Sequence, residues 1–218
     1  MASGVGKVKL STLERVLVPS AKRLFCQLKQ LPLMKNWYLA GGTALALQYG
    51  HRRSVDFDWF SPRSFSINKL ELSLRQLGRL KVLATDVGTW HGALNGVKIS
   101  FLYYPYPLLY PCLNYGWVRL ANDKDIACMK LQAISSRGSR KDFFDFYTIL
   151  KRYSLAEILH WVDRKFQGVK YSHLHLLKSL VYFNDAESEP NPVLLDRLNW
   201  TRVKTELRKQ VKLYLSST

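Results

Sequence analysis

Apolar side chains recur every three or four positions over residues 13–28, which predicts an opening helix that bends or restarts at Pro19. An apolar run over residues 37–40 then ends at two glycines, as expected for a short buried strand, a tight turn and a following helix. In residues 55–59 apolar and acidic side chains alternate, so this segment is predicted to be a strand with one buried face. The chain therefore begins as a mixture of helices and strands.

The pattern becomes wholly helical after residue 121. Before that point a helix and two strands joined through glycines are predicted, at residues 67–77, 80–84 and 97–103. Beyond it, helical spacing recurs in five segments, near residues 123–136, 140–152, 154–166, 172–183 and 198–215. A polar stretch with two prolines, residues 184–192, is predicted to be an internal linker. We therefore expect an α+β fold, with a core of short mixed sheet and flanking helices in residues 1–121 and a helical lobe in residues 122–218.

Composition and charge narrow the class of protein. With 218 residues, of which 47% are hydrophobic, the chain can bury a core, so we expect a globular protein. Its 33 lysines and arginines against 16 acidic residues give a net charge of +17, which favours a polyanionic partner such as nucleic acid or a triphosphate over a merely basic surface. No apolar stretch reaches the roughly 20 residues of a membrane span, and no secretion signal opens the chain, so we expect no membrane association and a cytoplasmic location. The sequence does not indicate an oligomeric state.

The candidate chemistry lies in two short motifs that follow one another within about twenty residues. Gly41, Gly42 and Thr43 come directly after a predicted strand, where glycines allow a phosphate to approach the backbone and the next helix offers its N-terminal amides. Asp56 and Asp58 lie two positions apart on a predicted strand, so both carboxylates project from the same face and can share a divalent cation. Each motif alone is weak. Together, in this order, they predict binding of a nucleoside triphosphate with metal and transfer of its nucleotidyl group.

The run from Tyr38 to Asp58, with the later Lys130 and the segment Arg140-Lys-Asp-Phe-Phe-Asp145, resembles the AbiEii toxin family of nucleotidyltransferases. These enzymes have the polymerase β-like fold and are the toxin halves of abortive-infection toxin–antitoxin pairs. The resemblance extends to about residue 150 and is most specific in the first motif. It implies transfer of a nucleoside monophosphate from NTP to an acceptor, which for some relatives is the 3′ end of tRNA. It also implies a separately encoded antitoxin as partner.

The same resemblance assigns roles to residues of this chain. Gly42 and Thr43, in the turn that Gly41 begins, would lie at the triphosphate. Asp56 and Asp58 would hold Mg²⁺ (or Mn²⁺). Lys130 would contact a phosphate, and an aspartate of the segment that ends at Asp145 would complete the catalytic site.

The chain departs from the superfamily pattern at the third carboxylate, which usually lies on a neighbouring strand. Ser100 falls near that position, and no acidic residue occurs between Asp86 and Asp123. A third acid would therefore come from Asp86 or from the helical half, where Asp142 and Asp145 share one helical face. Without it, the acceptor hydroxyl would lack the usual general base.

Basic and aromatic residues near the motifs have less specific interpretations. Only two residues separate Arg53 from Asp56, and Arg53 is the arginine that we expect at the triphosphate, although a solvated loop explains residues 51–53 almost as well. His91, next to Trp90, either stacks on a base or packs in a hairpin, and packing is the favoured interpretation.

Three functions remain open on the sequence alone. The first is a Mg²⁺-dependent nucleotidyltransferase that modifies an RNA acceptor such as the tRNA 3′ end and acts as a toxin. The second is transfer to a small molecule or to a protein hydroxyl. The third is a catalytically weakened module that binds nucleotide or RNA, an alternative motivated by Ser100.

Overall fold

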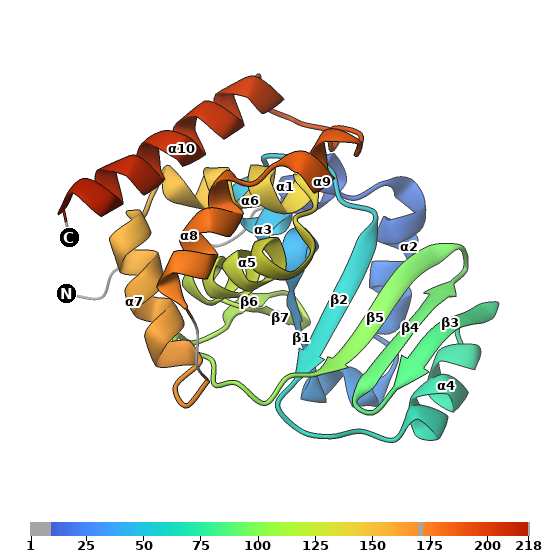
Figure 1. The fold of residues 1–218 in the computed structure, drawn as a ribbon. Helices are drawn as coiled ribbons and strands as arrows, with labels where there is room; N and C mark the ends of the chain where they lie inside the picture. Colours follow the sequence, from blue (N-terminus) through green and yellow to red (C-terminus); the bar gives the residue numbers. More distant parts are fainter. Residues whose placement is uncertain (1–9, 170–171, 218) are drawn as a thin grey trace, which may run out of the picture. The chain divides into compact units, whose positions relative to one another are not determined.

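A computed structural model describes residues 10–169 and 172–217 of the chain (Figure 1). The chain divides into two compact units. Met1–Pro107 and Pro111–Ala121 form the first, which we call the sheet unit, and Leu108–Tyr110 and Asn122–Thr218 form the second, the helical unit. The predicted α+β class is thus confirmed, because a seven-stranded sheet is followed along the chain by a run of helices.

The sheet unit is built on a mixed sheet whose strands run in the order β3-β4-β5-β2-β1-β7-β6 (Figure 1). Its strands are β1 (Tyr38–Ala40), β2 (Asp56–Ser61), β3 (Leu80–Asp86), β4 (Thr89–Leu94), β5 (Val97–Tyr103), β6 (Leu113–Tyr115) and β7 (Val118–Leu120). Strand β2 is at the centre, antiparallel to β1 and parallel to β5. The strand that carries the two candidate metal ligands is therefore fixed on both sides.

Four helices and one 3-10 segment accompany this sheet: α1 (Leu10–Val16), α2 (Pro19–Leu28), η1 (Pro32–Asn36), α3 (Gly41–Tyr49) and α4 (Ile67–Arg75). The predicted opening helix is interrupted just before Pro19, where Leu17 forms a bridge with Ser54 in the approach to β2. Helix α3 packs on β1 and β2, while α2 packs on β5 and α4 on β3. The glycine turn and the aspartate strand are thus joined by direct packing of the elements that carry them.

The two faces of the central strands differ in polarity, as strand alternation requires. One face is apolar and fully buried; it includes Phe57, Trp59, Trp90, Ile99 and Phe101. The opposite face carries polar side chains that stay partly exposed; it includes Asp56, Asp58, His91 and Ser100. Because in-register neighbours on paired strands share a face, the polar side chains of β2, β5 and β4 are gathered in one row.

Strand β4 was not predicted, because Gly92 in its middle was interpreted as part of a connection. The structure gives the reason for this glycine. A Cβ atom at Gly92 would lie 2.3 Å from the Trp90 ring, so the indole occupies the space of the missing side chain. The short strands β6 and β7 were also missed.

The helical unit contains α5 (Asp123–Arg137), α6 (Arg140–Leu150), α7 (Leu155–Lys165), α8 (His173–Val181), α9 (Asn184–Glu187) and α10 (Trp200–Ser217). Its core includes the rings of Phe143, Phe183 and Trp200, with centroids 5.2–5.7 Å apart. No helix in the described part of the chain is long and apolar enough to cross a membrane.

Leu108–Tyr110 belongs to the helical unit because of a buried aspartate at the start of α5. Asp125 accepts hydrogen bonds from the backbone amides of Leu109 and Tyr110, both at 3.0 Å. Its Oδ1 atom also lies 2.6 Å from Nζ of Lys165 on α7, and both side chains are fully buried. This ion pair is compensated by the two amides, as a charge removed from water must be.

The predicted linker at residues 184–192 is instead an ordered part of the helical unit. Its first residues form α9. Arg140 donates hydrogen bonds to the carbonyl oxygens of Ala186 and Glu187, each at 2.7 Å, and Ser139 donates to the Glu189 carboxylate at 2.7 Å. The prediction failed because polar side chains and prolines are equally typical of a loop that is fixed by hydrogen bonds from elsewhere in the fold.

Candidate active site

The glycine turn and the aspartate strand meet at Gly41 and Asp58. Gly41 begins α3 with φ +65°, a conformation that a residue with a side chain adopts at a cost. A Cβ atom there would lie 2.9 Å from Oδ2 of Asp58. Glycine is therefore required at this position for two reasons, the backbone angle and the carboxylate that lies against it. Two residues seventeen positions apart in the sequence thus form one site.

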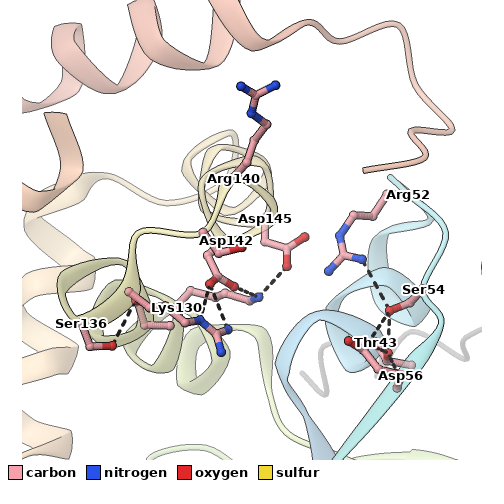
Figure 2. A network of polar contacts seen from close by, with 12 residues as sticks. Thr43, Arg52, Ser54, Asp56, Lys130, Ser136, Arg140, Asp142 and Asp145 are labelled. Carbon is pink, nitrogen blue, oxygen red and sulfur yellow. Dashed lines mark hydrogen bonds and ion pairs between the residues drawn. The ribbon is translucent and has the colours of Figure 1, made fainter. Parts of the chain in front are cut away.

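Thr43 connects the same helix to the other aspartate (Figure 2). Its hydroxyl donates to the backbone carbonyl of Asp56 at 2.5 Å and lies 2.6 Å from Oγ of Ser54. Ser54 in turn donates to Oδ1 of Asp56 at 3.3 Å. Thr43 and Ser54 are buried, so this network orients the Asp56 carboxylate from the interior of the sheet unit.

The Thr43 side chain is thus directed to Ser54 and Asp56. Helix α3 begins two residues before Thr43, after Ala40, and no side chain caps it. What Thr43 presents to an anion is its backbone amide, one of the first-turn amides that lack a partner within the helix. That assignment, and the matching one for Gly42, stays a prediction.

The strand register places Ser100 and His91 beside Asp58. Asp58 on β2 is paired with Ser100 on β5, and Ser100 is paired with His91 on β4. Nδ1 of His91 lies 2.9 Å from Oγ of Ser100, within hydrogen-bonding distance. Ser100, which the resemblance places near the usual third carboxylate, is thus hydrogen-bonded to an imidazole.

The donor set at Asp56 and Asp58 suits Mg²⁺ or Mn²⁺. Both carboxylates are partly exposed on one face and offer oxygen, the ligand that hard cations take. Among the described residues, no three His, Cys, Asp or Glu side chains gather closely enough to form a complete protein site. Magnesium commonly binds through one or two carboxylates with substrate phosphates and water as the remaining ligands. The pair therefore fits a metal that arrives with a triphosphate.

Asp86 lies far from the aspartate pair. It lies at the turn end of the β3–β4 hairpin, where its Oδ1 accepts a hydrogen bond from the Val87 amide at 2.7 Å. Its register partner on β4 is Thr89, which pairs in turn with Leu102 on β5 and not with Ser100. Since strands are spaced by about 4.8 Å, Asp86 lies roughly 14 Å from the strand that carries the aspartates.

Of the two neighbouring arginines, Arg52 has the closer connection to the network. Arg52 is buried, and its Nη1 donates to the Arg53 carbonyl at 3.0 Å and lies 3.4 Å from Oγ of Ser54. Figure 2 shows its guanidinium beside Ser54. Arg53, the arginine that the sequence favoured, has an exposed side chain, and its triphosphate role stays a prediction. The sequence contained a sign of this, because alternate residues of an extended segment point to the same side, and Arg52, Ser54 and Asp56 are alternate residues.

In the helical unit, Lys130, Asp142 and Asp145 form a buried ion cluster (Figure 2). Nζ of Lys130 lies 2.6 Å from Oδ1 of Asp142 and 2.6 Å from Oδ2 of Asp145. Arg137 completes it through Nε and Nη2, both 2.9 Å from Oδ2 of Asp142. Burial alone would raise the pKa of Asp142, but the Lys130 ammonium and the Arg137 guanidinium together outweigh burial and lower it.

This cluster brings together three of the predicted catalytic residues, and its charge qualifies their roles. The two cations and two carboxylates are formally neutral together. Arg140, although adjacent in sequence, points away from the cluster in Figure 2 toward the backbone of α9. The arrangement is that of a preformed, oriented group of ionised side chains, which suits either catalysis or the stability of the α5–α6 pair.

A cavity of about 570 Å³ in the sheet unit lies elsewhere. It is lined by η1, by the loop after β2 and by α4, with Arg63 and Lys69 among its polar residues. Neither the Gly41–Thr43 turn nor the aspartate pair lines it. The candidate chemistry therefore lies on the partly exposed polar face of the sheet and not in this cavity.

Comparison with known proteins agrees with the motifs. Residues 23–88, which include the glycine turn and both aspartates, match the model of the family described as "Nucleotidyl transferase AbiEii toxin, Type IV TA system". The chain is 38% identical over 193 residues to the protein aq_aa25 of Aquifex aeolicus (strain VF5), itself described as uncharacterized; the match covers 86% of this chain and 92% of that protein.

Solved structures share the fold at low sequence identity. MenT4, a nucleotidyltransferase toxin from Mycobacterium tuberculosis H37Rv, is similar with a TM-score of 0.57 at 16% identity, over 88% of this chain and 82% of that one. A putative nucleotidyltransferase from Helicobacter pylori is similar with a TM-score of 0.53 at 17% identity, over 94% and 95%. Motifs, family match and fold agree, and the chain belongs to the AbiEii family of nucleotidyltransferase toxins.

Proposed function

We propose that this nucleotidyltransferase moves a nucleoside monophosphate from an NTP to an RNA acceptor such as the 3′ end of tRNA. The observation that carries the proposal is the pair Asp56 and Asp58 on a partly exposed polar sheet face, with Asp56 held by Thr43 and Asp58 placed against Gly41. Carboxylates on a surface that binds no ligand would not need to be fixed in position in this way. Their positions suit a reaction in which charge must be neutralised at a triphosphate.

The chemistry assigned to the sheet unit follows from its groups. The acceptor hydroxyl attacks the α-phosphorus in line, the bond to the β-phosphate oxygen breaks, and pyrophosphate leaves. First-turn amides of α3, at Gly42 and Thr43, would bind phosphate oxygens. Asp56 and Asp58 would hold Mg²⁺ or Mn²⁺, which would supply positive charge to the phosphates and orient them.

An RNA acceptor is favoured by charge. The chain carries +17, and a polyanion gains more from such a surface than a cationic small molecule or a neutral protein hydroxyl. Those two acceptors remain the alternative. The family is described as part of a type IV toxin–antitoxin system, so we also propose an antitoxin, encoded separately, as a partner.

A part in the transfer is likewise proposed for Lys130, Asp142 and Asp145, which the resemblance assigns to phosphate contact and acid function. A purely structural role competes with this, because Lys130, Asp142 and Asp145 are buried and Arg137 completes the balance of their charges. Asp145→Asn separates the two, since it keeps the shape and removes the charge. Loss of transfer with an unchanged melting temperature, measured without NTP, supports a catalytic role. A loss of transfer that accompanies a lower melting temperature assigns the cluster to stability.

The experiment that tests the function is incorporation of label from each α-³²P NTP, with Mg²⁺ or Mn²⁺, into total RNA and into purified tRNA. We expect labelled RNA with wild type and a loss of at least about 100-fold with Asp56→Asn, because one of the two charge-bearing ligands is gone. Asp86→Asn, which changes an exposed aspartate of the same unit, is the matched control and should keep wild-type activity. Label on protein or on a small acceptor would select the alternative acceptors, and bound NTP without transfer would select the weakened module.

A further inference from the structure

We infer that His91 takes the proton of the acceptor hydroxyl, in place of the carboxylate that Ser100 replaces. The inference rests on the proposed function, because it concerns the acceptor side of the same reaction. It starts from the strand register, in which Asp58, Ser100 and His91 occupy one row across β2, β5 and β4. All three side chains lie on the partly exposed polar face.

Ser100 itself is unsuited to the role. A serine hydroxyl is not basic at neutral pH, so it cannot accept a proton from another hydroxyl. Imidazole is the side chain most often used for such transfers, because it gains and loses its proton near neutrality. With Asp58 assigned to the metal, the row contains one further suitable group, His91, which is hydrogen-bonded to Ser100.

The hydrogen bond between Nδ1 of His91 and Oγ of Ser100, at 2.9 Å, orients the ring. If Nδ1 carries the hydrogen and donates it to Ser100, Nε2 is left with its lone pair, as an acceptor requires. Ser100 thus has the function of a positioning residue, holding one tautomer and one ring orientation. A serine near the position of the third carboxylate then contributes to catalysis and does not indicate a weakened enzyme.

The spacing suits an acceptor that enters over Ser100. Strands are about 4.8 Å apart, so the row from Asp58 to His91 spans roughly 10 Å between backbones. A hydroxyl above Ser100 would lie between the metal-binding carboxylate and the imidazole. In the step, the hydroxyl oxygen forms the bond to the α-phosphorus, its proton passes to Nε2 of His91, and pyrophosphate leaves with the electrons of the broken P–O bond. The imidazolium then returns the proton to water.

The test compares His91→Asn, alone and with Ser100→Asp, in the labelled-NTP transfer assay with RNA. An asparagine amide can still donate to Ser100 but holds no basic nitrogen, so folding is preserved while the proton acceptor is removed. His160→Asn, at an exposed histidine of α7, is the matched control. Binding of a non-hydrolysable NTP and the melting temperature are measured for each variant.

We expect His91→Asn to lower kcat by on the order of 100-fold, with NTP affinity and melting temperature close to wild type. The control variant His160→Asn should match wild type in all three measurements. Adding Ser100→Asp should restore at least about tenfold, because a carboxylate returns to the neighbouring strand. Transfer by His91→Asn within about threefold of wild type would overturn the inference, as would a loss that Ser100→Asp does not relieve or that parallels a loss of NTP affinity. Absence of transfer by wild type would instead refute the proposed function itself.

Discussion

Replacing Gly41 with alanine tests whether the glycine turn positions the aspartate strand. Gly41 has φ +65°, and its missing Cβ would lie 2.9 Å from Oδ2 of Asp58. Ordinary contact begins near 3.4 Å, so the carboxylate must move by about 0.5 Å to admit the methyl group. The substitution therefore acts on the site in two ways, through backbone strain and through the position of Asp58.

The two effects have different magnitudes. A side chain in the left-handed conformation costs about 1–2 kcal/mol. The contact itself costs little stability, because a carboxylate can rotate away. Its effect on transfer is larger, since a misplacement of about 1 Å lowers rates by roughly 100-fold, and 0.5 Å at a metal-binding oxygen should cost at least about tenfold.

Gly50→Ala provides the control. Gly50 ends α3 with the same φ of +65°, but a Cβ there meets only Cγ2 of Thr12, at 4.0 Å. Both variants should lose about 1–2 kcal/mol in urea unfolding, whereas only Gly41→Ala should lose transfer. The measurements are urea denaturation and label incorporation from NTP, at saturating and at limiting Mg²⁺. If Gly50→Ala loses as much transfer as Gly41→Ala, or if Gly41→Ala keeps wild-type transfer, the contact with Asp58 has no functional weight.

Further outcomes follow from the buried polar groups. Thr43→Val removes the hydroxyl bound to the Asp56 carbonyl, so we expect a loss of about 1–3 kcal/mol in urea unfolding together with reduced transfer; full transfer would separate this network from the site. Lys165→Met leaves Asp125 charged and buried, so it should destabilise the chain by about 3–5 kcal/mol, and a change below about 1 kcal/mol would contradict the buried ion pair. The lowered pKa of Asp142 means that its stabilising effect is complete above its ordinary pKa, near 4, and is lost as the pH falls through the lower folded value. The stability difference between wild type and Asp142→Asn should therefore be constant above about pH 5 and shrink below about pH 4 in denaturation at a series of pH values; a difference that grows on acidification would show the opposite pKa shift.

The part of the site that lies within one strand–turn–helix–strand unit could be predicted from local sequence patterns. The strand, the glycine turn, the helix after it and the strand with Asp56 and Asp58 were all predicted, because glycine conformation and strand alternation are fixed by residues close in sequence. The same holds for the five long helices of the second half, whose apolar periodicity is local. What failed locally was Gly92, since a glycine inside a strand and a glycine in a connection look alike until Trp90 is seen over it.

The sequence by itself determined the family, the α+β class and the glycine and aspartate motifs. Tertiary structure alone decided that Ser100 lies beside Asp58 with His91 on it, that Thr43 holds Asp56, and that Lys130 is bound to both Asp142 and Asp145. These contacts join residues 9 to 42 positions apart through strand register and helix packing. Periodicity states which face of an element is buried, but it does not state which face of another element it meets, and that choice depends on the energy of the whole packed unit.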